Sequence, residues 1–321
     1  MMSMSFSRIV CVCVFVLVIT LTLSKLLTKT TADTTPTLQH YLLPQHRQPP
    51  APHTCNTTII SAYYRIKSKH SYEEYLSWMI NFLSLHDCMV IFVQPDLKEL
   101  ILSLRPPAYP TIIIPRPLES FQMAQLLDKK GWEEQEQKDP QHTKGHTKEL
   151  FWIWNEKTNM MKMVSDINPF LSSYFVWLDI GAIRHTLYNH NFLVRNIPEE
   201  KGVLLLSVEN FTTEEFRVEN SDFSLVDRIG GGTIGSDKET LERWYKEYYG
   251  TVRKYLQMGR FIGKDQNMMA TACLESDMCL LLHEDKDWLS TEHWFMMQEW
   301  FRGEKKIKPV RLNMNIVTQT L

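Results

Sequence analysis

Residues 174–181 read YFVWLDIG, and this stretch decides the fold class. Its first five residues are aromatic or aliphatic without a polar interruption, which is typical of a short buried strand. The strand ends at Asp179, which Ile180 and Gly181 follow. Because ligands of open α/β sheets bind beyond the carboxyl ends of the strands, Asp179 stands where a ligand-binding acid is expected. The alternative is that Asp179 only begins the turn into Gly181.

On both sides of this strand, segments with a strand pattern alternate with segments with a helix pattern. The predicted strands cover residues 56–66, 89–93, 111–114, 203–208 and 278–282, and the predicted helices begin at Ser71, Leu97, Lys157, Ser236 and Asp265. In the first helix, Ser71 and Glu74 have the spacing of a capping box. The alternation predicts an α/β fold with a mostly parallel sheet flanked by crossover helices.

Residues 128–149 do not follow this alternation. The segment is polar and contains Gly131, Pro140 and Gly145, so it is predicted to be a long flexible loop.

Gly230, Gly231 and Gly232 begin a Gly-rich stretch, GGGTIG, that is predicted to be a tight turn. The stretch matches G-x-G-x-x-G, but a nicotinamide site also needs an acid about 20 residues later, and that distance falls near Tyr249. A Walker A motif would need a lysine where Ser236 stands. What remains is a backbone segment that another group approaches closely, either a substrate or a neighbouring strand.

Four further positions carry side chains with a candidate chemical role: Asp265, Gln266, Arg184 and His283. Asp265 and Gln266 begin a helix, where an acid either caps the helix or points into a cleft. Arg184 can pair with a phosphate or with Asp179. His283 follows an apolar strand and precedes an acidic run that includes Asp285, so it either completes a metal site or belongs to a solvated edge.

The first 54 residues indicate a location. Residues 9–23 read IVCVCVFVLVITLTL and are apolar on all sides, and no pair of small residues follows as a cleavage site. We therefore predict a cytoplasmic tail over residues 1–8 and a transmembrane signal-anchor helix over residues 9–27. Residues 28–54 are rich in Thr and Pro and are predicted to form an extended stem or a plain linker.

The rest of the chain, residues 55–321, is predicted to be a lumenal domain. It contains two N-glycosylation sequons, at Asn56 and Asn210. It also contains an even number of cysteines, for which the sequence leaves all three pairings open: Cys55, Cys88, Cys273 and Cys279. The chain of 321 residues has a formal net charge of −2, which argues against binding to nucleic acid.

Four segments together resemble the HtrL/YibB-like family: WNEKTNMMKMVSDINPF, YFVWLDIGAIR, GGGTIGS followed by LERWYKEYY, and FIGKDQNMM. That family is grouped with glycosyltransferases of the GT-A type. The resemblance therefore implies a GT-A-like, Rossmann-like domain, here preceded by a single transmembrane helix.

A looser resemblance to nucleotide-sugar transferases implies roles for single residues. Asp179 matches the first acid of their D-x-D motif, whereas Gly181 stands in place of the second acid. Metal binding therefore lacks one ligand, which His283 or Asp285 would have to replace. Asp265 and Gln266 match a later D-Q pair, to which the resemblance gives a catalytic role.

The resulting hypothesis is a single-pass type II membrane glycoprotein of the Golgi or endoplasmic reticulum. It transfers a sugar from a nucleotide-sugar donor to a glycan or protein acceptor, with Mn²⁺ or Mg²⁺ as the expected cofactor. Asp179 and Arg184, together with the glycines at 230–232, bind the donor, and Asp179 and His283 hold the metal. The alternatives are a non-catalytic carbohydrate-binding or interaction protein on the same scaffold, and a metal-dependent hydrolase.

Overall fold

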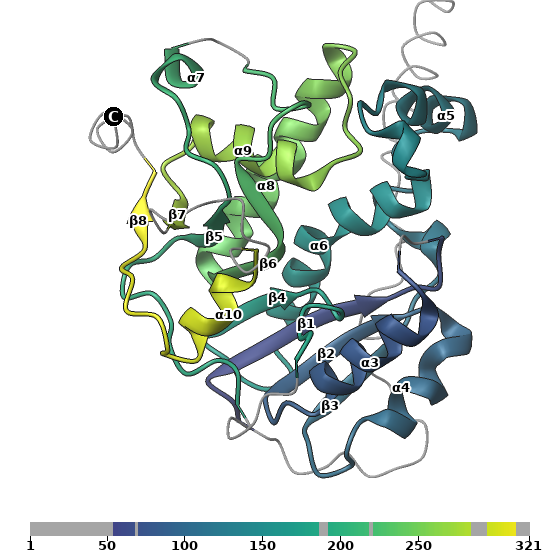
Figure 1. Cartoon of the computed structure of the whole chain (residues 1–321), viewed down its shortest axis with the longest axis vertical. Coiled ribbons are helices and arrows are strands. Elements are labelled where there is room, and N and C mark those ends of the chain that lie inside the picture. The colour runs from purple at the N-terminus through teal and green to yellow at the C-terminus, as the bar shows by residue number, and fades with distance from the viewer. Residues whose placement is uncertain (1–53, 68–69, 186–191, 218–220, 284–293, 313–321) are drawn as a thin grey trace, which may run out of the picture. The chain divides into compact units, whose positions relative to one another are not determined.

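The computed structural model describes residues 54–67, 70–185, 192–217, 221–283 and 294–312 (Figure 1). The predicted tail and signal-anchor, and the stem up to residue 53, lie outside these ranges. Within the described part of the chain, no helix combines the length and the hydropathy needed to span a membrane. All described elements belong to one compact unit, Tyr41–Leu321.

One eight-stranded sheet organises this unit, in the order β3-β2-β1-β4-β6-β5-β7-β8. Its strands are β1 Thr57–Tyr63, β2 Cys88–Val93, β3 Thr111–Pro115, β4 Tyr174–Leu178, β5 Val203–Ser207, β6 Ile229–Asp237, β7 Cys279–Leu282 and β8 Val310–Arg311. The predicted strand 174–178 is confirmed with the same limits as β4, and all five of its residues are buried.

The prediction of a mostly parallel sheet is wrong, because the sheet is mixed. β1 is parallel to β2 and to β4, β2 is parallel to β3, and β5 is parallel to β7. β6 instead lies between β4 and β5 and is antiparallel to both, and β8 is antiparallel to β7.

The same strand corrects a second prediction. Residues 230–235 were expected to form a turn, but they lie within β6. Glycine is usually unfavourable inside a strand, and it is found there where another group comes close. At Gly235, a Cβ atom would lie only 2.6 Å from the hydroxyl oxygen of Tyr174 on the neighbouring strand.

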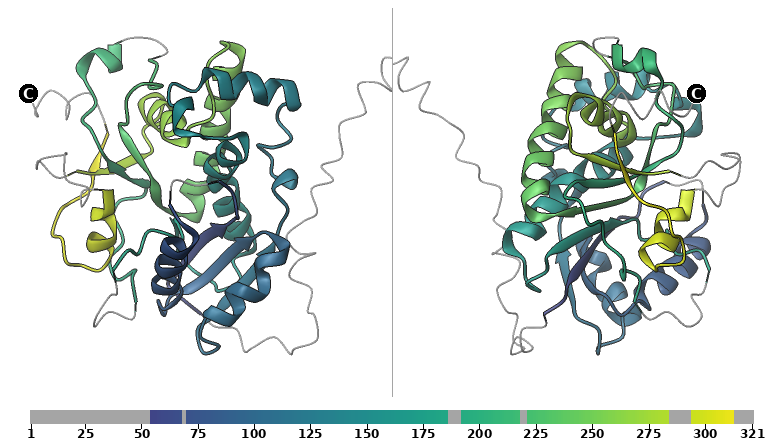
Figure 2. Two further views of the ribbon diagram at one scale, coloured as in Figure 1. Left: turned by 45° about the vertical axis from the view of Figure 1, so that its right-hand side comes forward. Right: turned by 90° about the vertical axis from the view of Figure 1, so that its left-hand side faces the viewer.

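Helices cover both faces of the sheet (Figure 2). The helices are α3 Tyr72–Leu83, α4 Lys98–Leu104, α5 Lys129–Lys138, α6 Lys148–Ile167, α7 Thr213–Arg217, α8 Lys238–Gln257, α9 Asp265–Glu275 and α10 Met296–Phe301, with 3₁₀ turns at Pro95–Leu97, Leu118–Ser120 and His142–Lys144. Apolar residues of α3, α4 and α10 share one core with side chains of β1, β2, β4, β5 and β7. Helices α6, α8 and α9 contact one another and strands β1, β4, β5 and β6.

The segment predicted to be a long flexible loop contains ordered helix. Asp128 caps α5 by accepting a hydrogen bond from the amide of Gly131 at 2.8 Å. Trp132 is buried and its ring meets that of Trp152 edge-on, with 5.9 Å between the ring centroids. A buried tryptophan and an N-terminal cap therefore stabilise α5. Its other residues are mostly polar, and this composition led to the wrong prediction of a loop.

Local predictions near the amino end of the domain are confirmed. Ser71 and Glu74 form the expected capping box at the start of α3. Of the three possible cysteine pairings, the structure has Cys55 bonded to Cys88 and Cys273 bonded to Cys279.

Candidate functional site

A buried lysine joins the candidate residues. Lys157, in the middle of α6, places its Nζ atom 3.2 Å from Oδ1 of Asp179 and 3.0 Å from Oδ2 of Asp265. Nζ also donates a hydrogen bond of 2.7 Å to the carbonyl oxygen of Gly231. Nζ of Lys157 therefore has one hydrogen bond and two ion pairs, all to oxygen atoms. The site therefore connects α6, the end of β4, β6 and the start of α9.

Strand pairing brings these residues together. Asp179 directly follows β4, and its amide donates to the carbonyl of Gly232 at 2.9 Å, which continues the β4–β6 ladder by one bond. Helix α9 is attached to the same strand, because Nε2 of Gln266 donates to the carbonyl of Ile229 at 2.6 Å. β6 thus positions Asp179 on one side and Asp265 on the other.

Gly231 has no side chain at the point where the Asp265 carboxylate approaches. A Cβ atom at Gly231 would lie 2.7 Å from Oδ2 and 3.0 Å from Oδ1 of Asp265. At Gly232, a Cβ atom would have ordinary contact, 3.5 Å, with Oδ2 of Asp179. At Gly231, the group that approaches the backbone closely is therefore a carboxylate of the protein itself.

The two carboxylates differ in exposure. The side chain of Asp179 is 44% exposed, whereas those of Asp265 and Lys157 are 4% exposed. Oδ1 of Asp179 also accepts a hydrogen bond of 2.7 Å from the indole nitrogen of Trp177. With Oδ1 held by Trp177 and Lys157, Oδ2 is the oxygen that Asp179 has left for a ligand.

Burial and pairing set the charges of the site. Burial alone lowers the pKa of Lys157, but the attraction of Asp179 and Asp265 outweighs it and the pKa lies above its ordinary value. Burial raises the pKa of Asp265, against the opposing effect of Lys157. An ammonium group is therefore a permanent part of the site at neutral pH.

Asn155, on the same helix as Lys157, fixes the segment before α9. Its amide nitrogen donates to the carbonyls of Phe151 and Gly263, each at 2.9 Å. Its side-chain oxygen accepts a hydrogen bond of 2.6 Å from the hydroxyl group of Tyr248 on α8. Because Asp265 follows Gly263 by two residues, Asn155 and Tyr248 hold its backbone in place.

Comparison with known protein families shows to which family the chain belongs. The family described as "Bacterial protein of unknown function (HtrL_YibB)" matches residues 55–297, which include the whole candidate site. The chain belongs to the HtrL/YibB family. Among curated proteins, no match to the chain is found. The family description assigns no activity, so the chemistry has to be argued from the site.

In this HtrL/YibB protein, two aromatic side chains lie beside Gly181. A Cβ atom at Gly181 would lie 3.2 Å from a ring carbon of Tyr75 and 3.3 Å from one of Trp78, both on α3. Arg184 is exposed, and its guanidinium group lies 4.1 Å from the ring centroid of Trp78 and 5.0 Å from that of Phe295. Among the described residues, Arg184 has no ion pair with Asp179.

The structure does not bring His283 next to Asp179. His283 follows β7, which β6 and β5 separate from β4, so three strand spacings of about 4.8 Å, or roughly 14 Å, lie between them. Asp285 lies outside the described residues. In the described ranges, no three His, Cys, Asp or Glu side chains are grouped so that they could hold a metal ion.

Lys157, at the centre of the candidate site, is not among the site residues predicted from the sequence. A signal for it exists in residues 155–159, NEKTN, which stand between the mostly apolar segments LFWIW and MMKMV of this helix. All five residues are at most 9% exposed. A polar run of this kind is usually interpreted as a solvent-exposed face. In this protein it is buried and forms the polar network around Lys157.

Proposed function

We propose that this HtrL/YibB protein is a glycosyltransferase that moves a sugar from a nucleotide-sugar donor to a hydroxyl group of a glycan or protein acceptor. The observation that supports this proposal is the position of Asp179 at the carboxyl end of a central strand. β1 pairs with β2 on one side and with β4 on the other, and the chain passes through β2 and β3 before it returns to β4 (Figure 1). The strand order therefore reverses between β1 and β4, where α/β sheets bind their ligands.

In the proposed reaction, the acceptor oxygen forms a bond to the anomeric carbon of the donor sugar. The bond from that carbon to the diphosphate oxygen breaks, and the nucleoside diphosphate leaves with the acceptor's proton. The protein has to hold the two reactants in this geometry and to balance the charge on the leaving diphosphate.

Residue roles follow from exposure and contacts. Asp179 contacts the donor through Oδ2, and the backbone of Gly230, Gly231 and Gly232 shapes the floor of the site. Arg184 is exposed and offers positive charge to the phosphates. Asp265 is buried, so we assign it a positioning role through Lys157; the predicted direct roles of Asp265 and Gln266 in catalysis stay predictions.

The expected Mn²⁺ or Mg²⁺ has an incomplete set of ligands in the described site. Such ions take carboxylate oxygens together with phosphate oxygens of a substrate. Asp179 supplies one outward oxygen, but Asp265 is held by Lys157, and Gly181 supplies no side chain. The described residues therefore do not fit a metal that needs two carboxylates.

The disulfides and the sequons support the proposed location. Disulfides persist in oxidising compartments such as the lumen of the endoplasmic reticulum, and this domain has two. Asn56 and Asn210 are both exposed and thus accessible to glycan attachment. Together they favour a lumenal domain of a type II membrane protein of the Golgi or endoplasmic reticulum, anchored by residues 9–27.

One observation favours the second candidate function, a carbohydrate-binding protein without catalysis. Tyr75 and Trp78 are only partly buried, and they stand where the transferases have an acid. Aromatic side chains with a few polar groups beside them are common in ligand sites. A protein of this kind would bind glycans with no contribution from a nucleotide.

Ligand-induced stabilisation separates the two candidates. We would titrate the protein with UDP, GDP and several UDP-sugars and follow the melting temperature. A ligand at 100 times its Kd stabilises the folded state by about 2.7 kcal/mol. We expect a shift for a nucleotide with the native protein, and none for the Asp179→Ala variant.

Asp277→Ala is the matched control for this titration. The side chain of Asp277 is 86% exposed, and the residue precedes β7, which runs in the same direction as β4, so Asp277 lies at the opposite end of the strands from Asp179. This variant should respond to nucleotides as the native protein does. A shift with glycans alone, equal in the native protein and the Asp179→Ala variant, would favour the non-catalytic candidate.

A further inference from the structure

We infer that the ammonium group of Lys157 takes the place of a divalent cation in this site, so that the nucleotide ligand binds without a metal ion. The identity of the ligand rests on the proposed function, whereas the role of Lys157 rests on the contacts of the described residues.

The atoms around Nζ are those that a hard cation selects. Divalent cations of this kind bind carboxylate and carbonyl oxygens. Nζ has two carboxylate oxygens and one carbonyl oxygen around it, from Asp179, Asp265 and Gly231. These residues come from the end of β4, from α9 and from β6, which are separate elements in the sequence. The lysine thus performs the bridging that a metal ion performs in other acidic sites.

The ammonium group cannot be exchanged for an ion from solution. Lys157 is in the middle of a 20-residue helix and its side chain is 4% exposed. The neighbouring Glu156 is fixed as well, because it is paired with Arg116 at 3.0 Å. A metal ion would have to displace a tethered cation and leave it buried without a counter-charge, which is strongly unfavourable.

The charge that remains suits a hydroxyl ligand. One ammonium group and two carboxylates leave a net charge of −1 in the site. The outward oxygen of Asp179 is then an acceptor for a hydroxyl group of the nucleotide or its sugar, which needs no metal between them. Positive charge for the phosphates is available from Arg184, which is exposed beside Trp78.

The first experiment measures Mn²⁺ binding without any nucleotide. The full chain and its Lys157→Ala variant are titrated with Mn²⁺, and bound Mn²⁺ is followed by electron paramagnetic resonance. Removing the side chain leaves three oxygens and two uncompensated carboxylates, so the variant should bind one Mn²⁺ at least tenfold more tightly than the native protein. It should also recover part of its lost melting temperature when Mn²⁺ is present.

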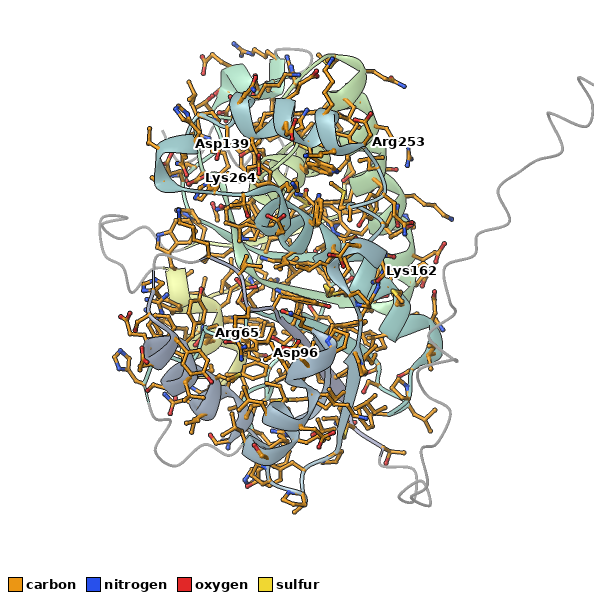
Figure 3. All side chains as sticks on the ribbon, turned by 90° about the vertical axis from the view of Figure 1, so that its right-hand side faces the viewer. Arg65, Asp96, Asp139, Lys162, Arg253 and Lys264 are labelled. Atoms are coloured by element: carbon orange, nitrogen blue, oxygen red, sulfur yellow. A yellow bond between two sulfur atoms is a disulfide. The ribbon has the colours of Figure 1, made fainter. Side chains whose placement is uncertain are left out.

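Lys162→Ala is the control on the same helix. Lys162 pairs with Asp166 and Glu242 at the surface, and Figure 3 shows it beside α8. This variant should bind Mn²⁺ no better than the native protein. A native protein that binds one Mn²⁺ as tightly as Lys157→Ala does, or a folded Lys157→Ala variant with no gain in affinity, would overturn the inference.

The second experiment needs no variant and so does not depend on the folding of one. UDP and GDP are titrated against the native protein by calorimetry, once with EDTA and once with Mn²⁺. We expect dissociation constants that agree within threefold, and a larger gain with Mn²⁺ contradicts the inference while it leaves the proposed function intact. If neither nucleotide binds under either condition, the proposed function fails, and the role of Lys157 is still decided by the Mn²⁺ titration.

Discussion

Nζ of Lys157 lies 3.0 Å from Oδ2 of Asp265, and both side chains are almost completely buried. A charge pair of this kind gains little over a well-packed apolar pair, but the loss of one partner is costly. A buried charge pair of this kind is useful where it holds a third group in place. Here that third group is the carboxylate of Asp179. It pairs with the same ammonium group and is the exposed part of the site.

Lys157→Met tests the cost of leaving the acids without a counter-charge. The methionine fills a similar volume but offers no charge to Asp265, so the free energy of unfolding should fall by about 3–5 kcal/mol. Urea denaturation followed by circular dichroism measures this change. Lys162→Met removes only partly exposed ion pairs of the same helix and should cost about 1 kcal/mol or less. Equal losses in the two variants would contradict the assigned role.

Gly231→Ala tests the close approach of Asp265 to β6. The new Cβ atom would lie 2.7 Å from Oδ2 of Asp265, so the carboxylate or the strand has to move. Overpacking of this kind should destabilise the protein by about 1–3 kcal/mol and abolish nucleotide-dependent stabilisation. At Gly250 of α8 a Cβ atom has no neighbour within 4 Å, so Gly250→Ala should be neutral or stabilise by up to about 1 kcal/mol. Thermal melts of both variants, with and without UDP, provide the comparison.

The alkaline limit of stability should depend on Lys157. Its pKa in the folded protein is raised above the ordinary 10.5, because Asp179 and Asp265 outweigh the effect of burial. The stabilisation by this charge is therefore complete below about pH 10.5 and is lost as the pH rises through the raised value. The difference in unfolding free energy between the native protein and Lys157→Met should be constant from pH 7 to pH 10 and shrink above that. If the difference in unfolding free energy instead grows with pH, the pKa of Lys157 is not raised in the folded protein and the prediction is wrong.

The two disulfides should contribute unequally to stability. Cys55 and Cys88 are separated by 33 residues, whereas Cys273 and Cys279 are separated by 6. In the chain-entropy account, the larger loop gives about 4 kcal/mol and the smaller about 2 kcal/mol. Replacing each pair by serines and measuring urea denaturation tests this order, and peptide mapping under non-reducing conditions tests the pairing itself.

Glycan attachment at Asn56 and Asn210 tests the predicted location. Both side chains are exposed, so expression in cells with a secretory pathway should give a protein that loses mass with peptide N-glycosidase. Asn56→Gln and Asn210→Gln should each remove part of this loss, and the double variant all of it. A native protein with no glycan at either position would contradict this prediction.

The strand-and-helix framework was predictable because local patterns agree with the fold. Residues 174–178 are apolar throughout, and the structure buries all of them in β4. Ser71 and Glu74 have the spacing of a capping box and form one. In such segments the local preference and the tertiary environment point in the same direction.

The remaining parts depended on contacts between distant segments. Position 231 of β6 is a glycine because the carboxylate of Asp265 occupies the space that a side chain would need. No sequence pattern near residue 231 indicates this contact. Asp179 and Asp265 are each indicated separately by a position at the end of a predicted element. Lys157 lies in a polar run that the sequence shows, but its pairing with both acids is evident only when α6, β4 and α9 are in place.

The strand order also has a consequence for biosynthesis. β5 is made before either of its neighbours, because β6 and β7 both follow it along the chain. Lys157 leaves the ribosome well before Asp265, so a nascent chain that ends ahead of α9 contains the cation without one of its two acids. Strands β1 to β4 can pair early, whereas β5 acquires its two neighbours only after β6 and β7 have been synthesised. A chain that ends between α6 and α9 therefore carries Lys157 without Asp265, and one that ends between β5 and β6 also leaves both edges of β5 unpaired.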